Sequence, residues 1–576
     1  MNLFLWLAPI LVPLAVGAVL TLRPGRGTSW LLAAAPVPAL LLAVTGPVLP
    51  APELPWLLLE PRLALDEPGR VLLGLTALVW IIAGVYGRTE AEQRGGFADW
   101  WLLSLTGNIG LLLSDDILTF YTAFVVMTLA AYGLVVHSRT AEARRAGRVY
   151  LVLGVAGETL LLAGLLLAAA DATGLRMADI AIAVAQSPDR DLIMALLVAG
   201  FGIKAGVIGL HIWLPLAHPA APFAASAVLS GAMIKAGLVG WLRLLPIGVV
   251  ALPGWSEVLV TLGLATAVLG VALGLTQRAP KVVLAYSSVS QMGFITLLIG
   301  VALASPSAAP VAVAAAAAYA LHHGIAKAVL FLAVGLLPQF GTGWRRTTLL
   351  VGVVVAGLAL AGAPLSSGAF AKAWMKQAID LALPGTNLTT LASLAAVGTT
   401  VLMARLLLLL RARLPDTAAV GPPPGLVPFS TLVAATLVAT PLVAPALFPA
   451  LATPGARSLV TEALWPVALG LLLATAAVLL RRRVSLHIPE VWPGDLVVIA
   501  ERAVSGAARG LAAAAPPVTT TLSRTSSAVQ AAALALGRRD EGLDRLEDRL
   551  TRWRTGGAMV ALVALAVTAA LLLPAR

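Results

Sequence analysis

The residues of this chain that can do chemistry are lysines inside long apolar runs. Lys204 and Lys235 lie in the stretch 200–240, whose other residues are chiefly Gly, Ala, Ile, Leu and Val. A charge at the centre of a bilayer costs about 2.5–3.5 kcal/mol on insertion scales, so such a residue is expected to be functional. Between the two lysines lie three helix-interrupting prolines, Pro215, Pro219 and Pro222. Because non-helical backbone at membrane depth persists only where protein buries it or water reaches it, this stretch indicates an ion path.

Other ionisable residues stand in similar apolar surroundings. His323 and Lys327 are four residues apart, which places both on one helix face, and a neutral histidine can relay protons near pH 7. Glu158 lies near the middle of an apolar run, where a carboxylate needs a partner. Lys372 follows GAPLSSGAF, a second helix-interrupting segment. Further candidates, for which a purely structural role is an open alternative, are His211, His218, His322 and Lys376.

The composition predicts a membrane protein without a redox centre of its own. Of 576 residues, 59% are hydrophobic and 11% charged, which is more apolar surface than a soluble protein of this size can bury. The net charge of +12 is interpreted as basic residues in cytoplasmic loops, not as a nucleic-acid surface. Cysteine is absent, which excludes disulfides, iron–sulfur clusters and thiolate metal sites. No nucleotide-binding or metal-binding motif is present, so we expect no cofactor and no metal.

Apolar runs long enough to cross a bilayer recur along the chain and predict about sixteen transmembrane helices. The predicted spans are 2–22 (a retained first helix, not a cleaved signal), 28–50, 70–87, 99–113, 117–136, 148–170, 190–210, 222–246, 257–276, 282–303, 311–336, 348–382, 387–410, 426–448, 460–480 and 557–574. Alternating basic and acidic loops place the N-terminus outside, provided that the interrupted run 348–382 crosses once.

Interrupted, lysine-bearing segments at 190–220 and 348–382 predict two inverted repeats with a site near the midplane. We therefore expect an all-α polytopic membrane protein. Leu543, Leu546 and Leu550 lie at helical spacing among charges and predict a cytoplasmic amphipathic helix. The expected divisions are N-terminal transmembrane helices (1–98), a first repeat (99–246), a second repeat (257–413), C-terminal transmembrane helices (426–483), a lateral amphipathic segment (484–556) and a terminal transmembrane anchor (557–576).

Four sequence strings, in order over about 100–400, suggest a family. They are HIWLPLAHPAAPFAASAVLSGAMIKAG (211–237), PKVVLAYSSVSQMGF (280–294), YALHHGIAKAVLFLAVG (319–335) and PLSSGAFAK (364–372). Together they resemble the antiporter-like subunits of complex I, of Mrp-type cation/proton antiporters and of the hydrogenase-4 and formate-hydrogenlyase complexes. The lateral segment followed by a last span is similar to the largest, distal subunit type of complex I.

The resemblance implies a proton path along the membrane midplane. Lys204 corresponds to the lysine of the first broken helix, and Lys235 to that of the next helix. His323 and Lys327 correspond to the His-x-x-x-Lys of the central helix, and Lys372 to the lysine of the second broken helix, the exit toward the outside.

Two positions depart from the family pattern. The glutamate that usually partners the first lysine is replaced by Val125, and the aspartate that often follows the exit lysine is replaced by Ala373. We expect Glu158 to take over the pairing with Lys204.

The resemblance implies a proton-translocating subunit of a complex I-related assembly in the inner (plasma) membrane. Exchange of sodium for protons is an open alternative. Its expected partners are other membrane subunits, the lipid bilayer and protons or sodium, with no nucleic acid. Whether the assembly is an oxidoreductase depends on those partners. Two alternatives are a membrane subunit that energises inorganic-carbon uptake with a soluble partner, and a non-translocating structural subunit, which the loss of a glutamate at Val125 favours.

Overall fold

The computed structural model describes residues 2–22, 29–46, 61–93, 96–414, 425–483 and 491–494. Within these ranges the chain is mostly helical, and its β-pairing consists of two isolated bridges. Twelve helical segments in the described part are long and apolar enough to cross a bilayer, and three shorter apolar ones accompany them. An all-α polytopic membrane protein is confirmed, whereas the predicted number of about sixteen crossings is not established.

The N-terminal third supplies the helices that surround the first candidate lysine. Its elements are α1 (Asn2–Leu22), α2 (Leu31–Ala34), α3 (Val37–Thr45), α4 (Glu67–Gln93), α5 (Phe97–Leu113), α6 (Ile117–Val135), α7 (Ala141–Ala170) and α8 (Met177–Gln186). Side chains begin two of these helices. Asp116 accepts a hydrogen bond from the Thr119 amide (2.7 Å) at α6, and Thr140 accepts one from the Ala143 amide (3.1 Å) at α7.

The first expected break is present, but it lies at a glycine before the three prolines that the sequence singles out, and Pro215 and Pro219 fall inside the next helix. Helix α9 (Arg190–Ala205) ends where Gly206 adopts φ +71°, a left-handed conformation that glycine tolerates best, and α10 (Trp213–Ala220) follows. The next span, expected as one helix over 222–246, has a second irregularity. It consists of α11 (Phe223–Gly231), a 3₁₀ turn η2 (Met233–Lys235) and α12 (Ala236–Leu244).

The second half of the chain also contains a broken helix. Its elements are α13 (Pro253–Thr276), α14 (Pro280–Ala304), α15 (Ala309–Leu336), η3 (Leu337–Gln339), α16 (Trp344–Ala361), α17 (Ser367–Ala382), α18 (Leu388–Ala412), α19 (Val427–Leu447), the π-helical turn η4 (Arg457–Thr461) and α20 (Glu462–Arg483). The break between α16 and α17 begins at Gly362, whose φ is +86°, and Ser366 caps α17 by accepting from the Ala369 amide. The run 348–382 therefore contains the interruption that the sequence predicts.

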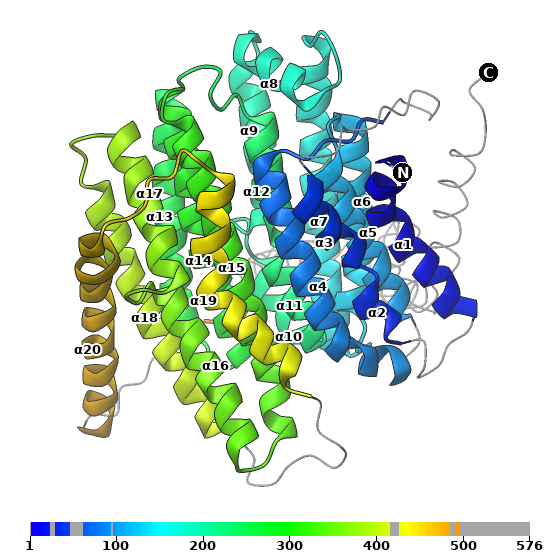
Figure 1. Cartoon of the computed structure of the whole chain (residues 1–576). Helices are drawn as coiled ribbons and strands as arrows, with labels where there is room; N and C mark the ends of the chain where they lie inside the picture. The colour runs from blue at the N-terminus through cyan, green and yellow to red at the C-terminus, as the bar shows by residue number, and fades with distance from the viewer. Residues whose placement is uncertain are drawn as a thin grey trace, which may run out of the picture.

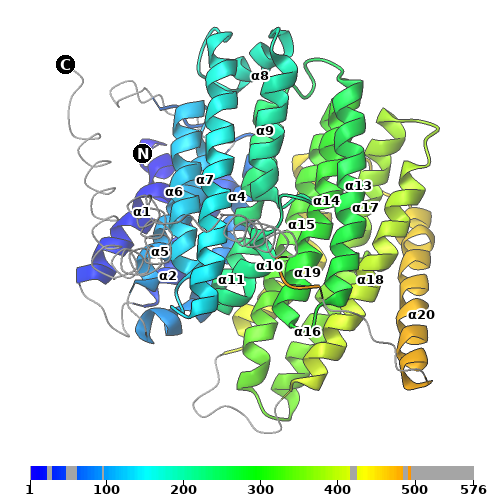
Figure 2. The ribbon, with the colours of Figure 1, turned by 180° about the vertical axis from the view of Figure 1, so that it is seen from behind.

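Helices α14 and α15 form the centre of the bundle, with α1 and α20 at opposite ends (Figures 1 and 2). Helix α15 packs against α4, α11, α14, α16, α17 and α19. Close approach of α11 and α15 depends on glycine, because a Cβ at Gly231 would lie 3.1 Å from the Gly324 carbonyl oxygen, and one at Gly324 would collide with the Gly231 carbonyl. Small residues at such crossings let membrane helices pack backbone to backbone.

The two broken helices run in opposite senses, since α9 lies above α10 whereas α17 lies above α16 in Figure 1. The inverted repeats and the division boundaries stay predictions. The expected lateral segment and terminal anchor, apart from 491–494, lie outside the described residues.

Candidate functional site

Lys204 ends the last turn of α9, directly before the first break. Its Nζ donates hydrogen bonds to Thr128 Oγ1 (3.3 Å) on α6 and to Tyr150 Oη (3.1 Å) on α7. The rings of Phe124, Tyr150 and Trp213 lie 5.5–5.9 Å from the ammonium, within the range of cation–π attraction. Lys204 is therefore held by hydroxyls and aromatic faces, and its charge does not snorkel to the surface.

Glu158 on α7 is buried near this lysine but is not in direct contact with it. Its carboxyl group interacts electrostatically with Lys204 and with the Thr128 side chain, and no ion pair within 4 Å joins the two charges in the described residues. Glu158 Oε1 has no hydrogen-bond partner. A cavity of about 10 Å³, room for about one water molecule, borders Lys204 and Thr128. The geometry places Thr128 between the two charges; the pairing itself stays a prediction.

Lys235 and Lys327 are fully enclosed at the centre. Lys235 lies in the 3₁₀ turn η2, and its Nζ donates to the Ser230 carbonyl (2.6 Å). Lys327 on α15 donates to the Leu284 carbonyl on α14 (2.9 Å). His323 interacts electrostatically with both lysines, and neither of its ring nitrogens has a hydrogen-bond partner. The packing of α11–α12 and α15 thus brings together three predicted residues, which we call the central cluster: Lys235, His323 and Lys327.

His322 faces the second break. Its Nδ1 shares a 2.8 Å hydrogen bond with the hydroxyl of Ser367, the first residue of α17. It also interacts electrostatically with Lys235 and with Lys372. From the sequence, a structural and a functional role were both open for His322. The structure places this histidine between the central cluster and Lys372.

Lys372 reaches back across the second break. Its Nζ donates to the carbonyls of Leu360 (3.2 Å) and Ala361 (2.5 Å) at the end of α16. These carbonyls have no partner within the helix, and the negative end of the helix dipole attracts a cation there. Gly362 leaves the space that the lysine occupies, since a Cβ there would lie 2.8 Å from Lys372 Cδ.

The two histidines of the first break differ. His218 stacks on Phe331 with 4.5 Å between ring centroids and interacts electrostatically with Lys281, Lys327 and Lys235. Lys281, at the start of α14, donates to the Ala221 carbonyl (2.6 Å). His211 is buried with its ring 5.8 Å from that of Tyr286. His218 therefore extends the row of ionisable residues formed by Lys204, Lys235, His323, Lys327, His322 and Lys372 toward the end of the bundle that is predicted to be cytoplasmic. The role of His211 stays a prediction.

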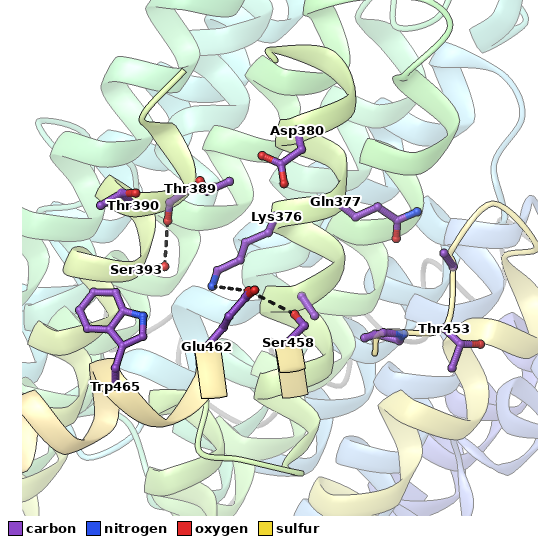
Figure 3. A pocket seen from close by; sticks show the side chains of 13 residues that line it. Lys376, Gln377, Asp380, Thr389, Thr390, Ser393, Thr453, Ser458, Glu462 and Trp465 are labelled. Atoms are coloured by element: carbon purple, nitrogen blue, oxygen red, sulfur yellow. Dashed lines mark hydrogen bonds and ion pairs between the residues drawn. The ribbon is translucent and has the colours of Figure 1, made fainter. Parts of the chain in front are cut away.

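Lys376 lies beyond Lys372 on α17 and forms an ion pair with Glu462 (3.3 Å) at the start of α20, as Figure 3 shows. The pair borders a cavity of about 510 Å³. Sequence reasoning named Lys376 but missed Glu462, Thr128 and Tyr150. Of these three residues, only Glu462 could have been found from the sequence, because it is an acidic residue at the edge of an apolar run.

Two partly buried arginines, Arg243 and Arg405, are anchors. Arg243 pairs with Asp66 (2.7 Å) and donates to the carbonyls of Leu111, Leu112 and Ser114. Burial by itself would raise the pKa of Asp66, but the guanidinium and the Gly69 amide lower it by more, so the pKa lies below its usual value. Arg405 similarly donates to the Gln277 carbonyl.

All six lysines of the chain belong to this row or border it: Lys204, Lys235, Lys281, Lys327, Lys372 and Lys376. Every other basic residue, apart from histidine, is an arginine. A lysine can release its proton when it is buried, whereas an arginine keeps its proton in proteins. The positions of the lysines and arginines therefore separate groups that can exchange protons, which lie in or beside the row, from groups that carry a permanent charge. Between Lys204 and Lys235 the described residues provide no direct contact, so that step requires water or movement.

Comparison with known proteins identifies the family. Residues 114–379 match the family described as NADH:quinone oxidoreductase/Mrp antiporter, TM. Subunit N of the NADH-quinone oxidoreductase of Polaromonas naphthalenivorans is 30% identical over 338 residues, which cover 54% of this chain and 68% of that protein. The chain belongs to this family. Hydrogenase-4 component B of Escherichia coli is also 30% identical, over 48% of this chain but only 43% of its own length.

The fold of this chain is similar to that of chains in two solved membrane complexes. The Mrp complex from a Dietzia species aligns with a TM-score of 0.71 at 24% identity, covering 93% of this chain and 63% of that one. The membrane-bound sulfane sulfur reductase, an archaeal respiratory membrane complex, aligns with a TM-score of 0.65 at 20% identity, covering 82% and 99%. The chain is therefore an antiporter-like membrane subunit, similar to subunits of multisubunit membrane complexes.

Proposed function

We propose that this chain is a proton-translocating subunit of a multisubunit complex in the plasma membrane. The observation that carries the proposal is the use of lysine, and never arginine, beside both helix breaks and at the centre of the bundle, where Lys204, Lys235 and Lys327 are buried and Lys372 is partly buried. A fixed charge at these positions would be served as well by arginine, as it is at Arg243. A basic group that must lose and regain a proton has to be lysine or histidine, since arginine keeps its proton.

Protons would move by short transfers between the members of this row. Lys235 and Lys327 interact electrostatically with His323 and with each other, and two positive charges in a low-dielectric interior repel each other strongly. Protonation of one lysine therefore favours release from the other. His322, bonded to Ser367, passes the change toward Lys372.

The helix breaks supply the polar backbone that the transfer needs. Lys204 lies in the last turn of α9, and the ammonium of Lys372, on α17, reaches the free carbonyls at the carboxyl end of α16, which stabilise it. Movement of the Glu158 carboxylate relative to Lys204 would change how strongly that ammonium is held, with Thr128 as the intermediate contact. Partner subunits would drive this movement.

The test is proton transport by the purified native complex in proteoliposomes, wild type against Lys327→Met and Glu158→Gln. We expect each variant to assemble normally and to lose most transport. Normal transport by Lys327→Met in an intact complex would refute the proposal. If Lys327→Met loses proton transport while Glu158→Gln transports normally, the proton path is restricted to the second half of the chain and the centre of the bundle.

One observation favours the structural alternative. The carboxylates expected next to the lysines of both breaks are absent, at Val125 and Ala373. A non-translocating subunit predicts that both variants transport normally while removal of the chain prevents assembly. The inorganic-carbon alternative stays a prediction that neighbouring genes would test.

A further inference from the structure

A polar cavity of about 510 Å³ lies between α17, α18 and the turn before α20 (Figure 3). Its walls carry both charges and hydroxyls, contributed by three elements that are distant in sequence. The residues that matter here are Lys376, Asp380, Thr390, Ser393, Ser458 and Glu462. A cavity with such walls is expected to hold water, because water satisfies polar groups that have no protein partner.

This cavity adjoins the surroundings of Lys372. A second cavity of about 20 Å³, room for about one water molecule, is lined by Lys372 and Gly362. The two cavities have five lining residues in common: Ala373, Lys376, Ser393, Ser458 and Glu462. The ion pair between Lys376 and Glu462 therefore stands between Lys372 and the large cavity.

Glu462 is positioned by an irregular turn. The π-helical turn η4 directly precedes it, and such turns within helices are frequent at functional sites. Its Oε2 accepts from Lys376 Nζ (3.3 Å) and from the Ser458 hydroxyl (3.5 Å), while Arg457 Nε lies 3.9 Å from Oε1. The carboxylate is thus partly neutralised on one side and faces the cavity shared with Lys372.

We propose that the large cavity is the outer release vestibule of the proton path, and that Glu462 is the carboxylate that accepts the proton from Lys372. An N–H bond of the Lys372 ammonium breaks, and the proton passes through the water of the small cavity to a Glu462 oxygen. The neutral acid releases Lys376 from its ion pair. Glu462 then gives the proton to water in the vestibule and pairs with Lys376 again.

The direction of release rests on the proposed function, whereas access of water to the cavity does not. The two parts can therefore be tested separately. Among the described residues, Arg457 on η4 also lies near Glu462, and Asp380 on α17 lines the same cavity.

Water access can be measured by cysteine labelling, because the native chain has no cysteine. Ser393→Cys places a thiol at the boundary of the two cavities, Thr386→Cys marks the exposed loop before α18, and Thr296→Cys is a buried control on α14. A membrane-impermeant methanethiosulfonate is added to sealed vesicles of each orientation containing the native complex. We expect Ser393→Cys to react from the same side as Thr386→Cys, and Thr296→Cys not to react. Absence of labelling at Ser393→Cys, or labelling only from the opposite side, overturns the vestibule.

The role of Glu462 is measured by proton transport in the reconstituted complex. Glu462→Gln should reduce the rate at least tenfold, whereas Glu257→Gln, an exposed carboxylate near the start of α13, should not change it. Because Ala373 lines both cavities, the double variant Glu462→Gln with Ala373→Asp should regain transport, which a merely structural role of Glu462 would not predict. Normal transport by Glu462→Gln together with loss in Lys372→Met overturns this role. Normal transport by Lys372→Met refutes the proposed function instead.

Discussion

The replacement Lys372→Arg tests whether the lysines carry protons or only charge. Lys372 is suited to this change because it borders a cavity of about 20 Å³, so the larger guanidinium has some room, and because its contacts are carbonyl oxygens that arginine can also bind. An arginine keeps the positive charge at the end of α16 and should support folding and assembly.

The magnitude follows from the difference between the two side chains. Their ordinary pKa values are separated by about 2–3 units, so an arginine at the same position loses its proton about 100–1,000 times less often. If deprotonation of this residue is required in each cycle, proton transport should fall by about that factor. Lys372→Met, which removes the charge but keeps the length, should also abolish transport.

The assay is proton uptake by proteoliposomes containing the native complex, normalised to the assembled amount. The reciprocal control is Arg405→Lys, where the side chain donates to the Gln277 carbonyl, and transport should be unchanged. Transport by Lys372→Arg within threefold of wild type would refute the reasoning, since a permanent charge would then suffice.

Three further predictions follow from the contacts. Tyr150→Phe removes one of the two hydroxyls bound to Lys204, and loss of a hydrogen bond to a charged group, worth about 1.5–3 kcal/mol, should slow transport at least tenfold. Tyr86→Phe, which loses hydrogen bonds to the Gly425 carbonyl and Phe429 amide far from the row, should leave the rate per assembled complex unchanged in the same assay. Because the pKa of Asp66 is depressed, its pairing with Arg243 stabilises the fold at neutral pH, and this contribution is lost as pH falls through that lowered value. Thermal unfolding followed from pH 7 to pH 3 should therefore show a smaller decrease in Asp66→Asn than in wild type, and an equal decrease would contradict the assignment. Gly324→Val should prevent the close packing of α11 and α15, and a normal yield of assembled complex on native gels would disprove that role.

The sequence alone determined the class of the protein and the positions of its unusual residues. Apolar runs predict spans because the bilayer sets their length, and lysines within those runs are conspicuous because burying a charge is costly. Both interrupted runs were predictable, since proline and glycine act on the backbone locally, but the residue at the first break was not: α9 ends at Gly206, whereas Pro215 and Pro219 lie inside α10. Helix α16 ends at Gly362, within the predicted segment.

Only the tertiary structure decided which groups meet. Lys204 binds Thr128 and Tyr150, which lie 76 and 54 residues away, and Lys376 binds Glu462, 86 residues away. Helical periodicity assigns a side chain to a face but does not say which helix packs on that face. His322 illustrates the difference, because its role depends on Ser367, which reaches it only through the packing of α17 against α15.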